Sequence, residues 1–492
     1  MGVAQNPAAS LPRSRAVAIT IEWAFFALLV SGLAWVPFWY GSHALIAWGI
    51  NAIIFPSLAA LYELSLILRG VPRPVAIPRI RLAAALFAAA AVWALVQNAT
   101  WVPAGWHHPI WQIASDLLGR PVAGSISVDR SLTAVALVRL ITAASVFWLA
   151  LQLSRDVIRA RWLIWTVVAI SVLYSTVGLF ALGFMPNGRV FGELAPSKFV
   201  ISTFLNQNTY ATFAGIGFLA AIGMTLRLYR RHLSRTGHLL RLQIAALIDT
   251  TGGKGALPLI LAFVLFTGLL LSGSRGGIFA TGLGFLVLLG LNMRRGKQSL
   301  RHEALLLIFT MLVVGAVFLG FSDVLARRIA AGGVYDQGRL HIFLVTIRSI
   351  LNAPLLGFGY GAFSATFPMF HDKSVNVWIF WDMASNTYLE ELQGLGLPFG
   401  TMLIASVVVL VWDCLKGART RQRDATIPAI AASVSFLVGA HALVESSLQI
   451  QAVTLTYMAV LGAGVAQARD EFPNANETSR SKLSLLAVGA NR

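Results

Sequence analysis

An arginine between two apolar runs offers the clearest chemistry in this sequence. Arg275 stands in the segment SGSRGG, whose glycines allow close packing of the backbone and whose serines can bond freed amide groups. Two interpretations are open. The guanidinium reaches the lipid headgroups from a tight turn, or it is held rigidly at the membrane surface and binds an anion. We favour anion binding, because basic groups close to hydrocarbon are costly and need a reason.

A second arginine, Arg139, lies within the apolar run VALVRLITAA and has no carboxylate near it in the sequence. An unpaired charge there is costly. The arginine therefore requires a partner such as Glu445 or a bound phosphate. Structural pairing and ligand binding both remain open for it.

Two other polar groups stand at the ends of apolar runs. Asn206 and Asn208 follow Phe204, and their amides either bond neighbouring helices or line a polar entrance for sugar hydroxyls. His441 and Glu445 are four residues apart near the end of the run 427–445, which places them on one face of the predicted helix. They form either a buried pair that holds a loop or a catalytic pair.

The segment 338–363 combines a predicted helix with a glycine run. Apolar residues recur at helical spacing, and Asn352-Ala-Pro354 is predicted to end the helix. Arg339 and Arg348 on this helix are not explained by packing. The glycines at 357, 359 and 361 are expected to bend the chain closely against another segment.

Neither a nucleotide-binding nor a metal-binding pattern is present. The GxGxG run lacks the strand–turn–helix context of a dinucleotide site, and TGGKGALP lacks the spacing of a phosphate-binding loop. Histidines at 107 and 108 are adjacent and the others are scattered. We therefore predict no metal and no cofactor.

The elements that position these residues are apolar runs long enough to cross a membrane. Hydrophobic residues make up 57% of the 492 residues and charged residues 12%, about half the share of a soluble domain. Runs of roughly 20 apolar residues predict an all-α polytopic membrane protein with about twelve transmembrane helices. They are 16–38, 44–68, 82–102, 133–153, 162–184, 200–226, 256–272, 276–293, 304–321, 387–412, 427–445 and 449–467.

The distribution of Lys and Arg predicts the orientation. With both termini in the cytoplasm, 27 of the 38 basic residues lie on the inner side. Loop bias therefore explains the basic excess, and no nucleic acid partner is implied. The longest outer loop, 322–386, lies between spans nine and ten. Residues 1–467 form one transmembrane domain with an uncleaved first span, and 468–492 form a disordered cytoplasmic tail. The single cysteine, Cys414, excludes an intrachain disulfide.

Five segments in this order resemble the bacterial O-antigen ligase and polysaccharide polymerase superfamily. They are TFLNQNTYATF (203–213), LLLSGSRGG (269–277), GRLHIFLVTIRSILNAPLLGFGYGAF (338–363), ASNTYLEELQGLGLPFG (384–400) and HALVESSLQI (441–450). The resemblance implies an inverting, metal-independent glycosyltransferase of the bacterial inner membrane. Its donor is a glycan on undecaprenyl pyrophosphate, and its active site faces the periplasm. The family arginines that grip the pyrophosphate match Arg275 and Arg339.

The sequence departs from the ligase pattern at Ser385 and in the spacing of a glycine pair, because Gly396 and Gly400 are separated by three residues rather than two. The family has His-Asn before its YLE stretch, whereas here Ser385 precedes Asn386. The expected base is therefore missing, which favours a polymerase of exopolysaccharide or O-antigen repeat units over a ligase to lipid A–core. Three residues remain as candidates for the base: His371, Glu390 and Glu391.

The predicted site comprises catalytic and substrate-binding groups. The catalytic set is Arg275, Arg339, Glu390 and His371. The substrate-binding set is Arg139, Asn206, Asn208, Arg348, Ser385, Asn386, Tyr388, His441 and Glu445. The expected partners are the lipid-linked donor, a glycan acceptor, the bilayer and a chain-length regulator. A rival from another class is a lipid-linked glycan flippase or transporter. Transporters usually have paired halves with a midplane site, whereas the polar residues here gather on one side.

Overall fold

The computed structural model describes residues 13–191, 196–233, 255–293, 337–370, 381–421 and 424–468, and the regular structure in these ranges is entirely helical. Eight helical stretches are long and apolar enough to cross a membrane. They are α1 (Arg13–Trp35), α2 (Leu45–Leu68), α3 (Arg81–Asn98, preceded by the short η1, Ile77–Ile80), α5 (Arg130–Leu153), α6 (Val157–Phe184), α7 (Gln207–Leu233), α10 (Arg275–Met293) and α14 (Thr387–Thr420). The chain is a polytopic helical membrane protein, as predicted.

Three further apolar helices are shorter. α9 (Ala256–Leu271), α15 (Thr426–His441) and α16 (Gln451–Ala466) have 16 residues each. A helix of this length rises about 24 Å, less than the roughly 30 Å of a hydrocarbon core. The eight long helices and these three shorter ones coincide with eleven of the twelve predicted runs. The predicted span 304–321 lies outside the described residues, so the count of twelve stays a prediction.

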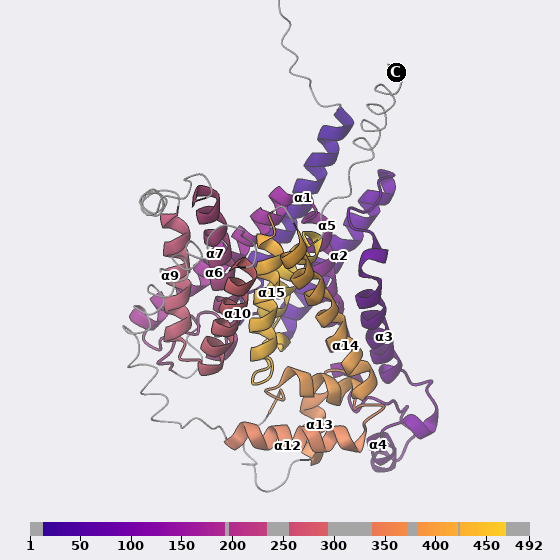
Figure 1. The fold of residues 1–492 in the computed structure, drawn as a ribbon. Helices are drawn as coiled ribbons and strands as arrows, with labels where there is room; N and C mark the ends of the chain where they lie inside the picture. Colours follow the sequence, from indigo (N-terminus) through magenta and orange to yellow (C-terminus); the bar gives the residue numbers. More distant parts are fainter. Residues whose placement is uncertain are drawn as a thin grey trace, which may run out of the picture.

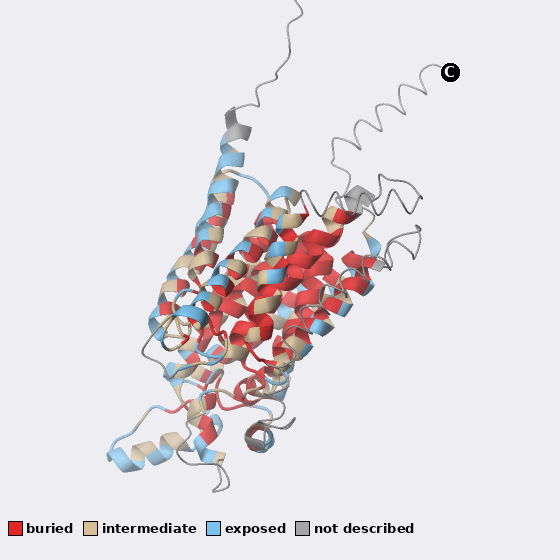
Figure 2. Cartoon of the chain, turned by 90° about the vertical axis from the view of Figure 1, so that its left-hand side faces the viewer, coloured by how far each residue is buried: buried red, intermediate tan, exposed pale blue. Residues whose placement is uncertain are grey.

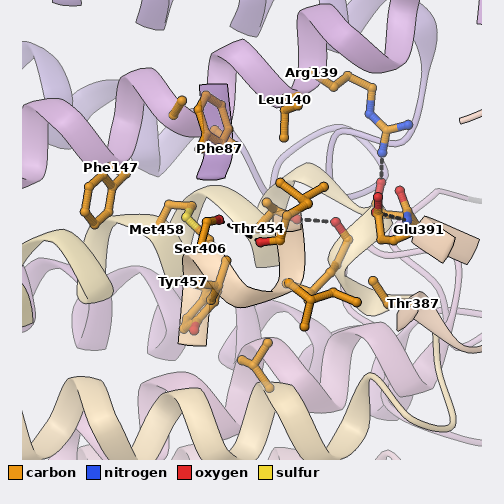
Figure 3. Close-up of a pocket in the computed structure, with 18 of the residues that line it drawn as sticks. Phe87, Arg139, Leu140, Phe147, Thr387, Glu391, Ser406, Thr454, Tyr457 and Met458 are labelled. Carbon is orange, nitrogen blue, oxygen red and sulfur yellow. Dashed lines mark hydrogen bonds between the residues drawn. The ribbon is translucent and has the colours of Figure 1, made fainter. Parts of the chain in front are cut away.

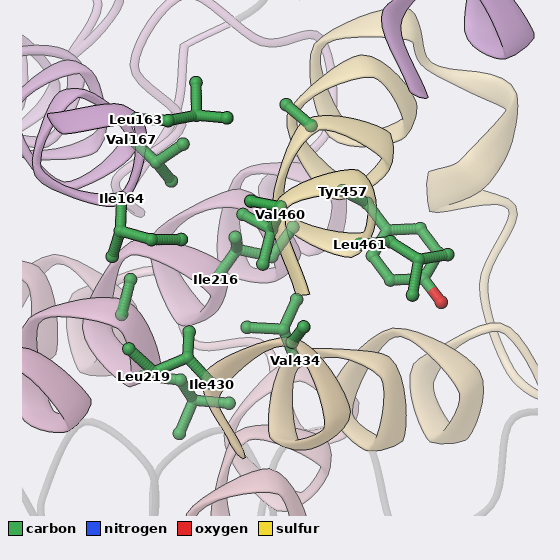
Figure 4. Packing of buried hydrophobic residues seen from close by; sticks show 14 of the residues in the cluster. Leu163, Ile164, Val167, Ile216, Leu219, Ile430, Val434, Tyr457, Val460 and Leu461 are labelled. Atoms are coloured by element: carbon green, nitrogen blue, oxygen red, sulfur yellow. The ribbon is translucent and has the colours of Figure 1, made fainter. Parts of the chain in front are cut away.

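The core of the bundle lies where α7, α15 and α16 meet. Nearly all of the apolar part of α7 is buried inside the molecule, and the buried residues form the centre of the molecule in Figure 2. Figure 4 shows Ile216 and Leu219 of α7 packed among side chains of α6, α15 and α16. Close approach is possible because a β-carbon at Gly223 would lie 2.3 Å from Ile430.

Short helices form a layer at one end of the bundle. In Figure 1, α4 (Ile110–Leu118), α12 (Gln337–Asn352) and α13 (Phe363–Phe370) lie at the end opposite to the start of α1, and α12 runs across the bundle. α12 ends at Asn352, two residues before Pro354, as expected. The polar groups that the sequence analysis predicts in the outer loops and adjoining span ends lie at this end of the bundle.

Helix α14 is broken by a kink close to this layer. Gly396 has φ 77° and ψ 165° inside the helix, a conformation that glycine adopts without steric cost. The glycine run at 357–361 packs against the kink, as predicted. The amides of Phe358 and Gly359 donate to the carbonyls of Gln393 and Gly394 at 3.1 and 3.0 Å.

Two side chains of α3 bond the carbonyls at the kink. The Gln97 amide donates to Leu356 O at 2.6 Å and to Gly394 O at 2.8 Å, and Trp93 Nε1 donates to Leu395 O at 3.0 Å. Buried carbonyl groups without a partner are costly. The two side chains therefore stabilise the non-helical backbone at this end of α14.

Candidate functional site

The turn after α15 brings several predicted residues together. Glu445 is 6% exposed and accepts from Asn208 Nδ2 at 2.7 Å and from Asn206 Nδ2 at 3.4 Å. Arg339, from α12, lies 3.2 Å from the same carboxylate and also donates to Val444 O at 2.5 Å. Three distant segments of the chain therefore meet at one carboxylate.

His441 joins the same cluster through α7. Its Nδ1 lies 2.7 Å from Thr212 Oγ1, which bonds Ser447 Oγ at 2.8 Å. The predicted helix over 427–445 is wrong at its end. α15 stops at His441 and Glu445 lies in the following turn, so the two residues do not share a helix face. We call Asn206, Asn208, Thr212, Arg339, His441, Glu445 and Ser447 the polar cluster.

Arg275 begins α10 beside this cluster. A β-carbon at the next residue, Gly276, would lie 3.0 Å from His441 Nε2. The first amides of a helix carry a partial positive charge. The Ser274 hydroxyl accepts from the Gly277 amide at 3.2 Å and so caps the first turn. The predicted anion-binding arginine therefore stands at a positive helix end close to His441.

The charge balance of the cluster depends on Glu445. Burial raises the pKa of the Glu445 carboxyl above its ordinary value, while Arg339 and the Asn208 amide oppose this rise. The opposing bonds favour the charged form. Glu445 thus holds Arg339 in a fixed position, and the pair presents a preorganised guanidinium.

A small polar pocket adjoins the cluster. Its volume is about 210 Å³, and its polar lining residues are Tyr40, His43, Asn206, Thr209, Asp382, Ser385, Glu445 and Ser446. Ser385 therefore faces the same space as Asn206 and Glu445. The sequence interpretation missed Tyr40 and His43. The polar turn between the first two apolar runs was their only signal.

The residues at the start of α14 are engaged with the protein. Asn386 caps the helix by accepting from Leu389 N at 3.0 Å and donates to Leu443 O at 2.9 Å. Tyr388 donates to Gly439 O at 2.9 Å, and Glu390 accepts from Ala384 N at 3.0 Å. These bonds fix the start of α14 against the end of α15. Substrate binding by Asn386 and Tyr388 and catalysis by Glu390 stay predictions.

A larger, mostly apolar cavity of about 1120 Å³ lies between α3, α5, α14, α15 and α16. Figure 3 shows Arg139 and Glu391 at one end of it and Phe147, Tyr457 and Met458 further along. The lining includes His43 and Asp382, which also line the polar pocket. The two spaces are therefore neighbours.

Arg139 does not pair with Glu445, which was one of the two expected partners. It donates to Gln449 O, and its guanidinium carbon lies 4.3 Å from the centre of the Trp48 ring. Its Nε and Glu391 Oε2 are buried without a hydrogen-bond partner among the described residues. One end of the cavity therefore carries two polar atoms, Arg139 Nε and Glu391 Oε2, that can still bond a ligand.

Of the predicted site residues, Arg139, Arg348, Asn386, Tyr388 and Glu390 lie outside the cluster. Arg348 lies on the exposed side of α12, and His371 falls outside the described residues. Within the described ranges, no group of three or more metal-ligating side chains comes together.

The fold and the site define a polytopic helical membrane protein in which arginine, asparagine, histidine and glutamate side chains gather at one end of the bundle. Residues 260–405 match the family model described as O-Antigen ligase, and this segment includes Arg275, Arg339 and Ser385. The match confirms the resemblance to the O-antigen ligase and polysaccharide polymerase superfamily, which implies a glycosyl-transferring enzyme of a bacterial membrane. None of the curated proteins compared with the chain matches it.

Proposed function

We propose that the chain is a polymerase that transfers a glycan from undecaprenyl pyrophosphate to a sugar hydroxyl at the periplasmic face of the inner membrane. The observation that carries this proposal is the meeting of Arg339, Glu445 and Asn208 beside Arg275. Two of these residues, Arg275 and Arg339, belong to the segment that matches the O-antigen ligase family. The proposed topology has twelve spans with both termini in the cytoplasm.

The proposed mechanism relies on charge stabilisation at the leaving group. The bond between the sugar and the pyrophosphate is already activated, and negative charge grows on phosphate oxygens as it breaks. Guanidinium groups bond such oxygens in pairs and do not give up their proton. Arg275 and Arg339 are the donors to this developing charge. The acceptor hydroxyl attacks from the opposite face of the sugar, with inversion.

The surroundings of the cluster fit a lipid-linked substrate. The polar pocket offers amide, hydroxyl and carboxylate groups, which are the usual partners of sugar hydroxyls. The neighbouring cavity is mostly apolar and has room for part of a lipid chain. A site of this kind suits a substrate with one polar end and one hydrocarbon end.

Ser385 supports a polymerase over a ligase to lipid A–core. It stands where the ligases have histidine, and a serine hydroxyl does not take a proton at neutral pH. A strain without the chain separates the possible functions by what it accumulates. A single lipid-linked repeat unit indicates a polymerase, and a full-length lipid-linked chain indicates a ligase. Intermediates that stay on the inner side of the membrane indicate a flippase and would contradict the proposal.

Alanine at either arginine tests the assignment of the donor site. Removing one donor to a developing oxyanion costs about 10²–10³-fold in rate. We therefore expect Arg275→Ala and Arg339→Ala each to reduce polymer yield by that order. Arg120→Ala is the matched control, because Arg120 is exposed after α4 and lines neither cavity. Normal polymer yield and length in both site variants would refute the assignment.

A further inference from the structure

The turn between α1 and α2 holds an unusual backbone. Tyr40, Gly41 and Ser42 have φ values of 50°, 66° and 56°, three successive left-handed residues of which two are not glycine. Such residues are strained and persist only where their surroundings hold them, and they cluster at functional sites. The next residue is His43.

Several bonds hold this turn in place. The Ser42 hydroxyl donates to Val36 O at 2.6 Å, and Trp48 Nε1 donates to Ser42 O at 2.8 Å. The Ala452 amide donates to Gly41 O at 3.0 Å. A β-carbon at Gly41 would lie 2.6 Å from the Phe204 ring, so the turn is packed tightly against the segment that precedes α7. The backbone that directly precedes His43 is therefore held by several neighbouring segments.

His43 lies between the two cavities. It lines the polar pocket together with Asn206, Ser385 and Glu445, and it also lines the large apolar cavity. Within the described part of the chain, no hydrogen bond of its ring nitrogens is found, and the ring packs 6.2 Å from Trp48 between centroids. The imidazole is thus held by packing while its nitrogens stay available for a ligand.

We infer that His43 is the general base that takes the proton from the acceptor hydroxyl. This inference rests on the proposed function. It supplies the base that is missing at Ser385, from a different element but in the same pocket. The other histidine close by, His441, is 1% exposed and its Nδ1 is bonded to Thr212.

The charged groups around His43 suit this role. They are Arg139 from α5, Asp382 before α14 and Glu445 after α15, and Tyr40 lies on its own turn. Burial, and then Arg139, lower the pKa of His43 below its ordinary value near 6.5, while Asp382 opposes them. The imidazole is therefore neutral at pH 7 and able to accept a proton. The Asp382 carboxylate stabilises the imidazolium that forms.

The step is balanced in atoms and electrons. The acceptor oxygen gives its proton to a ring nitrogen of His43 and uses its electron pair to bond the anomeric carbon. The bond from that carbon to the phosphate oxygen breaks, and its electron pair leaves with the pyrophosphate held by Arg275 and Arg339. No oxidant, reductant or further reactant is needed.

The test uses the purified full-length chain in lipid nanodiscs with a lipid-linked repeat unit as both donor and acceptor. For the unchanged protein we expect elongation to fall at acid pH, with a midpoint below 6.5, because protonated His43 cannot accept a proton. We expect His43→Gln to lower the rate about 10²–10⁴-fold, to lose this acid limb and to bind the donor within about threefold of the unchanged protein. His107→Gln, outside both cavities, is the control and should keep the rate and the pH profile.

A second variant separates catalysis from folding. Imidazole in the buffer should restore elongation to His43→Ala in proportion to its free-base concentration, which a purely structural histidine would not allow. If His43→Gln elongates normally while Arg339→Ala does not, His43 is not the base and the proposed function stands. If His43→Ala is inactive and imidazole does not rescue it, the inference is also overturned. If the unchanged protein does not elongate the repeat unit, the proposed function itself fails.

Discussion

Glu445 shows how one buried carboxylate can organise a site. Its two oxygens accept from the amides of Asn206, just before α7, and Asn208, within α7, and from a guanidinium of α12. The carboxylate therefore joins segments that are far apart in the sequence. A buried charge is costly unless it is paired and hydrogen-bonded. The position of Arg339 therefore depends on the asparagines as well as on its own helix.

Changes at Asn208 should reveal the charge on Glu445. Asn208→Ala removes a hydrogen bond to a charged group, a loss of about 1.5–3 kcal/mol. Asn208→Asp places a second carboxylate against the first, which costs about 4 kcal/mol at 4 Å and an effective dielectric constant of 20. The favourable placement of an aspartate near a helix N-terminus returns only about 0.3–1 kcal/mol. At pH 7.5 we therefore expect thermal stability to fall further in Asn208→Asp than in Asn208→Ala.

The pH dependence gives this comparison a control. The pKa of Glu445 is raised, so its carboxyl takes up a proton at a higher pH than an ordinary glutamate does. The repulsion in Asn208→Asp is then relieved, and the difference between the two variants should narrow as the pH is lowered from 7.5. Equal melting midpoints at pH 7.5 would show that Glu445 carries no charge beside Asn208.

The kink in α14 is the feature of a single element that most affects the site. It turns the start of the helix, with Asn386 and Tyr388, towards the end of α15, where both side chains bond the backbone. Pro398 and Gly396 were visible in the sequence, but their partners were not. The carbonyls at the kink are satisfied by α3, which lies almost 300 residues earlier.

A methyl group at the kink should destabilise the molecule. In Gly396→Ala the new β-carbon would lie 2.4 Å from Leu355 O at a φ of 77°, and a left-handed residue alone costs about 1–3 kcal/mol. We expect a lower melting midpoint and a lower polymer yield. Gly282→Ala is the matched control, because this position in α10 has open space around it. Replacing a helical glycine there should raise stability by about 0.5–1 kcal/mol. Equal stability of both variants would contradict the role of the kink.

At the scale of the whole molecule, the sequence predicted the spans far better than the site. An apolar run is a local property, and the described helices therefore coincide with eleven predicted runs. The end of α15 was misjudged because HALVES carries no glycine or proline to mark a stop. His43 was missed because residues of α5, α7 and α14 line the two cavities beside it. Only the fold brings these elements together.

The predicted orientation can be tested with the single cysteine as an internal control. Cys414 is buried, so it should not react with a maleimide reagent that cannot cross the membrane. In cells with a permeabilised outer membrane, we expect Arg120→Cys to be labelled and Thr420→Cys to stay unlabelled until the inner membrane is opened. If only Thr420→Cys were labelled while the inner membrane was still intact, the orientation would be opposite to the predicted one.

The bonds between α3 and α14 also have a consequence for the order of biogenesis. Gln97 and its partner Gly394 are 297 residues apart. At about 5–20 residues per second, synthesis reaches the partner some 15–60 s after α3 has formed. During that interval the amide cannot bond the kink. This end of the molecule therefore closes only after translation has passed α14, and a newly made chain stays without a finished site until then.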